Sequence, residues 1–328
     1  LNLDKISLKF KNKIKFYMPQ CSPYIQHGVP LRYFVNKNIE TIGGQANCYV
    51  KKFTKKDYFE VSNVHNLKKY FKNVKNKKKV LKDVKNNIQQ RFEGKKLNNY
   101  SDFYLIKTAY DKSKKKLNIK FDAIIFLPDF FDATHIFPPG KGVFEDFYEW
   151  INQTLFFLSK KNLRVAIKPH PNSVYASKMF ENELIKKYSR HIFIDNQISN
   201  NRIFLNRPLF GISPYGTVLH ELAYHNIIPI SAGPNPFMSY DFVFTPSTKK
   251  QYFNFINLAI KKKLKLPKNK TQQICEQYYM WNNYNFDYFE NKSRDYSLKT
   301  KLITSRTGDE SKILDIYNKN LKSNFKKC

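Results

Sequence analysis

The sequence predicts an α/β protein built on a parallel, doubly wound sheet. From residue 121 onward, apolar runs of strand length alternate with longer runs whose apolar residues recur at helical spacing. Several of these apolar runs stop abruptly at small, polar and histidine residues. The carboxyl ends of strands are where open α/β sheets bind their ligands, so the same pattern that predicts the fold also places a site.

The alternation can be followed along the chain. We expect a buried strand over 121–127, a helix over 143–158, a strand over 165–168, a helix near 179–188 and a strand over 191–194. Apolar residues recur on one side of the helix over 143–158, as expected for a helix that covers a sheet.

The most specific stretch lies at residues 209–230 and reads as a complete βαβ unit. Apolar runs at its two ends flank a break at Ser213–Gly216 and a short segment with helical spacing. A helix N-terminus offers free backbone N–H groups and the positive end of the helix dipole, so Gly216 and Thr217 lie where a phosphate would bind. The alternative is that Ser213 and Thr217 only cap a helix.

A chain of 328 residues is longer than most single domains. We predict an N-terminal domain over 1–115, with short strands and a basic helix, and a nucleotide-binding domain over 116–265. A helical tail over 266–328 should pack back across them, its aromatic residues buried. The charged stretch at 112–118 is typical of a linker.

Composition excludes some classes of protein. No window approaches 18 uninterrupted apolar residues and no signal peptide is visible, so we expect a cytoplasmic protein. The four cysteines are scattered and none has CxxC spacing, which favours a reducing compartment and argues against a zinc or disulfide framework.

The chain is strongly basic, with 58 Lys and Arg against 26 Asp and Glu and a net charge of +32. We expect one helix over 67–92 with a lysine-rich outer face, and a second lysine cluster at 261–270. Such clusters suit attachment to an anionic membrane surface, although solvated faces rich in lysine are the plainer explanation. A nucleic-acid-binding module without catalysis should interleave cations and aromatics on one face. Here histidines, glycines and prolines gather at strand ends instead, so we expect no nucleic acid partner.

Four segments in order carry a resemblance to a known group of enzymes. They are Gln26-His-Gly-Val-Pro-Leu-Arg32, Phe126-Leu-Pro-Asp129, Ile167-Lys-Pro-His-Pro171 and Ser213-Pro-Tyr-Gly-Thr-Val-Leu-His-Glu221. Together they resemble the bacterial surface-polysaccharide transferases of the GT-B fold. The capsule and lipopolysaccharide glycosyltransferases, including the retaining Kdo transferases, resemble the last three segments. The CDP-glycerol glycerophosphotransferases of teichoic acid synthesis resemble the first segment and the later His-Pro.

The resemblance implies two Rossmann-like domains facing a cleft, the N-terminal one short or remodelled. It implies a metal-independent glycosyltransferase that moves a sugar from a CMP-Kdo-like or other nucleotide-sugar, CMP and CDP types favoured. The acceptor would be a growing capsule or lipopolysaccharide glycan, free or lipid-linked, at the inner face of the bacterial cytoplasmic membrane. The likeness is strongest over 121–250. The chain departs from the glycerophosphotransferases in having Tyr-Gly-Thr at 215–217 where they have a Ser-Ser pair.

The candidate site residues follow from these motifs. Cleavage of the donor leaves negative charge on a phosphate, which helix N-termini and basic side chains can stabilise. The expected donor-binding residues are Lys168, His170, Ser213, Tyr215, Gly216, Thr217 and Glu221, with Glu221 on a ribose hydroxyl as the resemblance implies.

The acceptor hydroxyl needs a base, and a retaining mechanism needs two carboxyl roles. The catalytic candidates are His27, Asp132, His135 and His170, and the resemblance places Arg32 on the acceptor side. His27 lies in an expected loop bounded by glycine and proline, where it is the base that the glycerophosphotransferases imply. Asp129, Glu145 and Asp146 are further carboxylates near the same strand end. Two related activities stay open: a CDP-polyol phosphotransferase of the glycerol-phosphate type, and a nucleotide-sugar epimerase of the same architecture.

Overall fold

A computed structural model describes residues 16–19, 24–43, 51–58, 64–92, 117–132, 142–171 and 173–283, with single positions at 3, 5, 14 and 22. The contacts divide the chain into two compact units, one containing residues 1–58 and the other residues 59–283. The sequence predicts domain boundaries near residues 115 and 265. The larger unit of the structure begins at residue 59 and ends at residue 283, so it also contains the lysine-rich region over 67–92 and the helix that follows residue 265. The predicted linker lies outside the described residues except for its last two positions.

The larger unit, residues 59–283, is built on a five-stranded parallel sheet in the order β6-β5-β4-β7-β8. The strands are β4 (Ala123–Phe126), β5 (Val165–Lys168), β6 (Ile192–Phe193), β7 (Phe210–Ser213) and β8 (Ile228–Ser231). The chain steps outward from β4 to β6, then returns to pair β7 with the other side of β4. The predicted α/β class with a parallel sheet is confirmed, and its topological switch point lies between β4 and β7.

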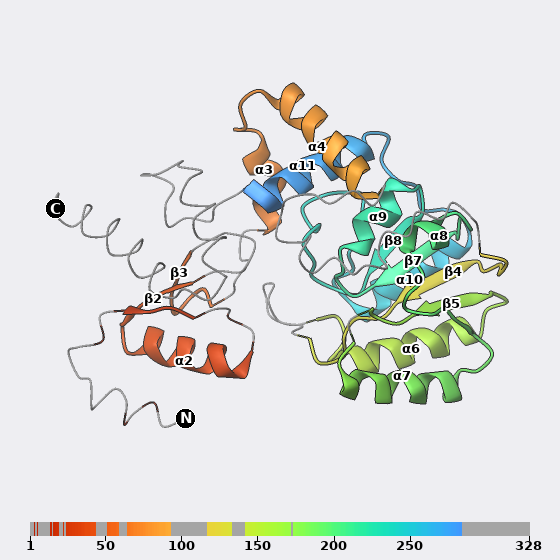
Figure 1. The fold of residues 1–328 in the computed structure, drawn as a ribbon, viewed down its shortest axis with the longest axis horizontal. Helices are drawn as coiled ribbons and strands as arrows, with labels where there is room; N and C mark the ends of the chain where they lie inside the picture. Colours follow the sequence, from red (N-terminus) through yellow and green to blue (C-terminus); the bar gives the residue numbers. More distant parts are fainter. Residues whose placement is uncertain are drawn as a thin grey trace. The chain divides into compact units, whose positions relative to one another are not determined.

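Helices cover both faces of this sheet (Figure 1). They are α6 (Phe147–Ser159), α7 (Tyr175–Lys187), α8 (Asn200–Phe204), α9 (Val218–Tyr224) and α10 (Lys249–Ile260). Trp150 of α6 and Tyr252 of α10 join the core that includes Ile125 on one face. On the other face, Phe204 of α8 packs on Phe126, and Leu222 of α9 packs over Gly211 of β7. The main core therefore forms from residues 121–260.

The start of α6 shows how local chemistry sets an element. The apolar spacing begins at residue 143, yet the helix begins at Phe147. Asp146 is its N-cap and accepts a hydrogen bond from the backbone N–H of Glu149 at 2.7 Å. The carboxylate of Glu149 in turn accepts the backbone N–H of Glu145 at 2.7 Å. This reciprocal pairing satisfies N–H groups at the helix start, so the helix begins later than periodicity alone predicts.

The helix expected over 67–92 is two helices, α3 (Leu67–Phe71) and α4 (Lys77–Phe92). The chain turns between them, and Asn76 adopts a left-handed conformation with φ 53°. A helix cannot continue through that conformation, which asparagine tolerates better than most residues. Val84 and Ile88 of α4 are buried, and α4 packs on α11 (Lys270–Asn283).

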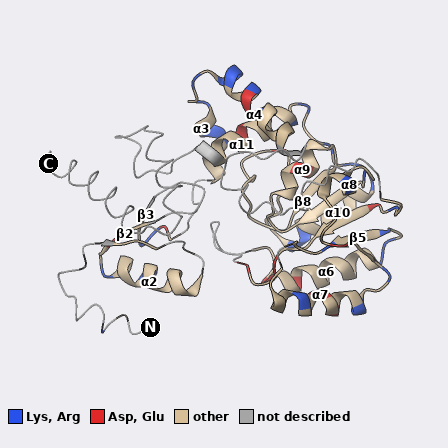
Figure 2. Ribbon diagram, viewed as in Figure 1, with Lys and Arg blue, Asp and Glu red and all other residues tan. Residues whose placement is uncertain are grey.

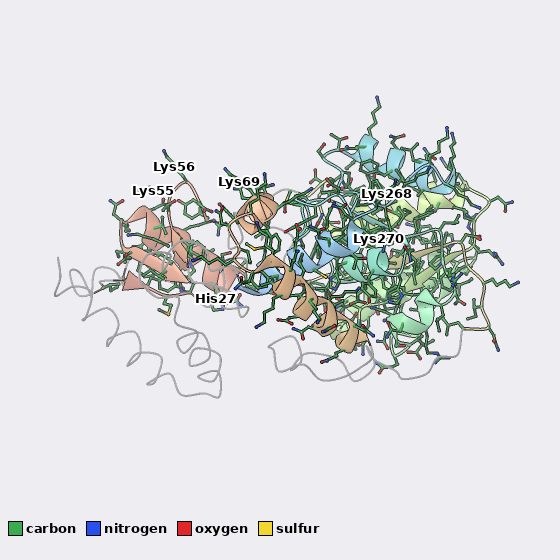
Figure 3. The ribbon with its side chains drawn as sticks, turned by 90° about the horizontal axis from the view of Figure 1, so that it is seen from above. His27, Lys55, Lys56, Lys69, Lys268 and Lys270 are labelled. Atoms are coloured by element: carbon green, nitrogen blue, oxygen red, sulfur yellow. The ribbon has the colours of Figure 1, made fainter. Side chains whose placement is uncertain are left out.

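Most lysines of α3, α4 and the turn between them are exposed. Lys72, Lys75 and Lys77–Lys79 are exposed, as predicted for a basic outer face. Figure 2 marks lysine and arginine positions on the ribbon of α3 and α4 in blue. Lys69 on α3 and Lys268 just before α11 are exposed too; Figure 3 labels both. In α11, Tyr278 is buried as expected for the aromatic tail, while residues 284–328 lie outside the described part of the chain.

The smaller unit contains a three-stranded sheet in the order β1-β2-β3. Its elements are β1 (Phe16–Tyr17), α2 (Ile25–Asn36), β2 (Glu40–Gly43) and β3 (Lys51–Phe53). β1 runs parallel and β3 antiparallel to β2. Leu31 and Val35 of α2 pack with Phe53 to form its core.

The prediction of a loop around His27 is wrong, because His27 lies in the first turn of α2 (Figure 3). Gly28 and Pro30, which predicted the loop, are both inside the helix. A Cβ at Gly28 would lie 2.4 Å from the carbonyl oxygen of Ser22, so glycine is needed for a close approach of two chain segments and does not mark a loop. Pro30 sits near the helix start and removes one N–H donor.

Among the described residues, no helix has the length and apolar character needed to cross a membrane.

Candidate functional site

The carboxyl edge of the parallel sheet gathers most of the predicted site residues. Lys168 ends β5 and His170 follows it, while Asp129 and Asp132 follow β4. The turn from Ser213 to Thr217 follows β7 on the other side of the switch point. The candidates in this unit thus come together from three neighbouring strands, as parallel strands require.

Lys168 is the buried end of a polar network that runs through Asn200 to Glu221. Its side chain lies on the sheet face covered by α8 and α9, and the residue is only 5% exposed. The ammonium donates a hydrogen bond to Asn200 Oδ1 at 3.2 Å. Asn200 Nδ2 in turn donates to Glu221 Oε2 at 2.9 Å. One amide therefore links a predicted cation on β5 to a predicted carboxylate on α9.

Burial lowers the pKa of Lys168 to about 8, because the apolar surroundings disfavour the charged form, and the carboxylates of Glu221 and Asp195 oppose that shift. The amine is therefore mostly charged near neutral pH. A buried cation without a full ion-pair partner in direct contact is costly, and such groups concentrate at functional sites.

His170 lies next to this network at the end of β5. Burial lowers the pKa of its imidazole, and the nearby carboxylates of Asp129 and Asp132 do not fully offset that effect. The ring is therefore predominantly neutral at pH 7. A neutral imidazole has one donor and one acceptor nitrogen, so it can hydrogen-bond a phosphate or pass a proton.

Asp132 and Tyr215 join the two sides of the switch point. The Tyr215 hydroxyl donates to Asp132 Oδ2 at 2.8 Å, linking the segment after β4 to the turn after β7. The ring of Tyr215 packs on Phe147 at the start of α6, with ring centroids 5.7 Å apart. The hydrogen bond and the ring contact orient an exposed carboxylate at the strand edge.

The neighbouring carboxylate, Asp129, has a structural role. It accepts hydrogen bonds from the backbone N–H groups of Phe131 and Val174 at 2.9 and 2.8 Å, and from the Ser177 hydroxyl at 2.7 Å. Burial would raise its pKa, but these three donors outweigh burial and the net pKa is lowered. Asp129 fastens the β4 loop to the start of α7, as Asp146 caps α6. This leaves Asp132 as the best-placed carboxylate of the predicted group.

The turn after β7 is tight. A Cβ at Gly216 would lie 3.1 Å from Ser213 Oγ, so a larger residue would crowd the serine hydroxyl. Thr217 is the N-cap residue of α9, yet its side chain makes no capping hydrogen bond. The capping role considered for Thr217 is therefore absent. His220, on the same helix, is buried and packs near Phe237 with ring centroids 5.7 Å apart.

Three predicted residues are not brought to this edge by any described contact. His27 and Arg32 belong to the smaller unit, where Arg32 Nη1 donates to the Gly28 carbonyl at 3.1 Å and the guanidinium lies 5.4 Å from the Tyr58 ring centroid. His135 lies outside the described residues.

Sequence reasoning missed Asn200. The signal was present, because the segment 195–200 follows β6 within a few residues and so reaches the same edge of the sheet. The sequence does not predict that the Asn200 amide of α8 contacts both Lys168 and Glu221.

Comparisons with protein-family models, with curated proteins and with solved structures found no match to this chain. Across the described residues, no three His, Cys, Asp or Glu side chains gather in a way that could hold a metal ion.

Proposed function

We propose that the carboxyl edge of the parallel sheet binds a nucleotide-activated sugar, and that the protein transfers the sugar to a glycan acceptor. The observation that carries the proposal is that one edge of the sheet holds two polar groups: the Lys168–Asn200–Glu221 network, and the Asp132–Tyr215 pair that spans the switch point. In this proposal the smaller unit contributes the acceptor side of a GT-B-type enzyme, and the acceptor is a capsule or lipopolysaccharide glycan.

The chemistry of the donor explains the residue types. Transfer breaks the bond between the anomeric carbon and a phosphate oxygen, and the electron pair stays on the departing phosphate. The Lys168 ammonium and an N–H of His170 would stabilise that charge, in a site where burial strengthens each interaction. Glu221, held in place by Asn200, would accept a hydrogen bond from a ribose hydroxyl.

The acceptor contributes the new bond to the anomeric carbon and must lose a proton. Asp132 is the base that this unit offers, since its carboxylate is exposed and oriented by Tyr215. His27 is the alternative base from the smaller unit. Asp132→Asn and His27→Ala, each assayed for transfer with the donor saturating, separate the two: the variant that loses turnover while still binding nucleotide identifies the base.

A thermal-shift screen with CMP, CDP, UDP and GDP tests the donor site. A ligand present at 100 times its Kd should raise the unfolding free energy by about 2.7 kcal/mol, and we expect the largest shift from a cytidine nucleotide.

His170→Ala should fold normally and lose about 10²-fold in donor turnover, the size expected for one charge-stabilising donor. No shift with any nucleotide, together with an unaltered rate in the variant, would end the proposal.

A turnover assay with and without acceptor distinguishes glycosyl transfer from the epimerase and polyol-phosphate transferase activities. Glycosyl transfer consumes a nucleotide-sugar only when acceptor is present, whereas an epimerase converts it without acceptor. A polyol-phosphate transferase instead consumes CDP-glycerol and releases CMP. A clear preference for UDP or GDP compounds would rule out the Kdo-like donor.

A further inference from the structure

A pocket lies at the amino edge of the parallel sheet, opposite the proposed donor site. It has a volume of about 670 Å³ and sits where the strands begin: Asp122 precedes β4, Arg164 precedes β5 and Leu209 precedes β7. Arg207, after α8, and Lys262, after α10, complete the wall. The volume falls within the range of roughly 300–1,000 Å³ that is typical of small-molecule sites. The proposed donor site does not use this edge.

The charged side chains of the pocket are mostly cationic. Lys120, Arg164, Arg207 and Lys262 line it, and Asp122 is the only carboxylate on its described wall. Arg164 already pairs with that carboxylate: its backbone N–H donates at 2.9 Å and its guanidinium at 3.2 Å. The pocket therefore keeps three cations that its own carboxylate does not neutralise.

Two of these cations occupy unusual backbone positions. Arg207 and Lys262 follow the ends of α8 and α10 with φ 50° and 54°, in the left-handed region. Two other helix ends with this conformation carry asparagine, Asn38 after α2 and Asn226 after α9. Asparagine and glycine tolerate this conformation, whereas a long side chain is strained in it. Strain at two positions that line one pocket points to a use for their side chains.

We propose that this amino-edge pocket binds a small molecule that carries two or more phosphate groups. Guanidinium and ammonium groups donate several charge-assisted hydrogen bonds to phosphate oxygens, and three cations match the charge of a diphosphate. Leu117 and Leu209, both partly exposed, line the same pocket and offer contact to an apolar or aromatic part of the ligand. The inference goes beyond the proposed function, because the two sites lie at opposite edges of the sheet.

The test measures binding of inorganic pyrophosphate, of a nucleoside diphosphate and of inorganic phosphate to the full chain by calorimetry. A Lys168→Met background removes the main cation of the carboxyl edge, so binding that persists there belongs elsewhere. The double variant Arg207→Asn/Lys262→Asn removes two cations and places at both positions the residue that other helix ends use. We expect pyrophosphate affinity to fall about 10-fold or more, with Tm unchanged or raised.

The matched control is Lys261→Asn/Lys263→Asn, which removes the same charge from exposed residues that flank Lys262 but do not line the pocket. Equal loss of affinity in both double variants would reduce the effect to the general field of a basic protein and overturn the proposal. So would loss of pyrophosphate binding in Lys168→Met alone. Inorganic phosphate binding as tightly as pyrophosphate would overturn the requirement for two phosphates.

A measurement on the unaltered protein avoids any question of variant folding. Lysine acetylation followed by mass spectrometry reports which amines a ligand covers. Saturating pyrophosphate should protect Lys120 and Lys262 and leave Lys261 and Lys263 reactive. Uniform protection of all four, or none, would contradict a site in this pocket.

Discussion

Lys168 holds a charge in an environment that disfavours charge, and this makes it the most informative single residue. Its amine contacts one neutral amide directly, with Glu221 one hydrogen bond further away. An anionic ligand would supply the missing opposite charge. The residue should therefore affect stability and ligand binding in opposite directions.

The stability effect has a definite sign. The pKa of Lys168 is about 8 in the folded protein and has a usual value of 10.5, so between these pH values the unfolded chain binds more protons. The unfolding free energy should thus rise from pH 8 to 10.5, by about 3 kcal/mol at most for one group. Urea denaturation of the wild type and of Lys168→Met measures this, and the wild type should show the steeper rise. Parallel curves would mean that the amine titrates normally.

The binding effect follows by linkage. A bound phosphate favours the charged amine, so nucleotide affinity should weaken as the pH rises through about 8, and this weakening should be absent in Lys168→Met. Calorimetry at pH 7 and pH 9 is the measurement.

The variant Asn200→Ala tests the amide that bridges Lys168 and Glu221. Nucleotide affinity should fall, because both residues lose their shared hydrogen-bond partner. Equal affinity in that variant would make the amide a packing residue.

At the scale of elements, the contact between β7 and α9 positions the turn that ends in Thr217. A Cβ at Gly211 would lie 2.6 Å from Leu222 Cδ1, and Leu222 is fully buried. Gly211→Ala should therefore destabilise the protein by about 1–3 kcal/mol through overpacking. Denaturant unfolding measures the loss. Adding Leu222→Ala makes room, so the double variant should be more stable than the sum of the single changes predicts. Strict additivity would mean that the two sites do not interact.

The exposed lysines near α3 and α4 are the candidates for binding an anionic membrane surface. The apolar face of α4 is used against α11, so attraction to a membrane would be electrostatic, without insertion of that face. Neutralising Lys75 and Lys77–Lys79 together should weaken binding to vesicles that contain anionic lipid by at most about 1 kcal/mol per charge. Activity on a soluble acceptor analogue should be spared. Co-sedimentation at low and physiological salt measures the binding, which should fall as salt rises.

The control for this experiment removes four exposed lysines elsewhere on the same unit: Lys160, Lys178, Lys186 and Lys187. If it weakens vesicle binding equally, Lys75 and Lys77–Lys79 have no special role. Loss of activity on the soluble analogue in the α4 variant would instead place those lysines in the acceptor groove.

At the scale of the whole molecule, the two compact units predict independent folding. The core of the parallel sheet comes from residues 121–260, all within the larger unit. A chain of residues 59–283 should therefore unfold cooperatively and show the same nucleotide-induced thermal shift as the full chain, because the proposed donor site is complete within it. Calorimetry of the two chains compares them. A fragment without a cooperative transition would show that the larger unit depends on the rest of the chain.

The sequence by itself determined the features that depend on short-range patterns. Alternating periodicities predicted the parallel sheet, and abrupt strand ends predicted that Lys168, His170 and the Ser213–Thr217 turn would meet at one edge. Both inferences work because hydrophobic spacing is local and parallel strands all end on the same side.

Only the tertiary structure decided what depends on contacts between distant segments. From the sequence, Gly28 predicts a loop, and only the structure shows the Ser22 carbonyl packed closely against it. Asn200 likewise resembles an ordinary surface amide in the sequence, whereas in the structure its side chain bonds both Lys168 of β5 and Glu221 of α9. The pocket at the amino edge is a stronger case, since Arg207 and Lys262 come from different helix ends and share no motif. Tertiary packing determines which distant side chains contact one another, and the spacing of residues along the chain does not predict those contacts.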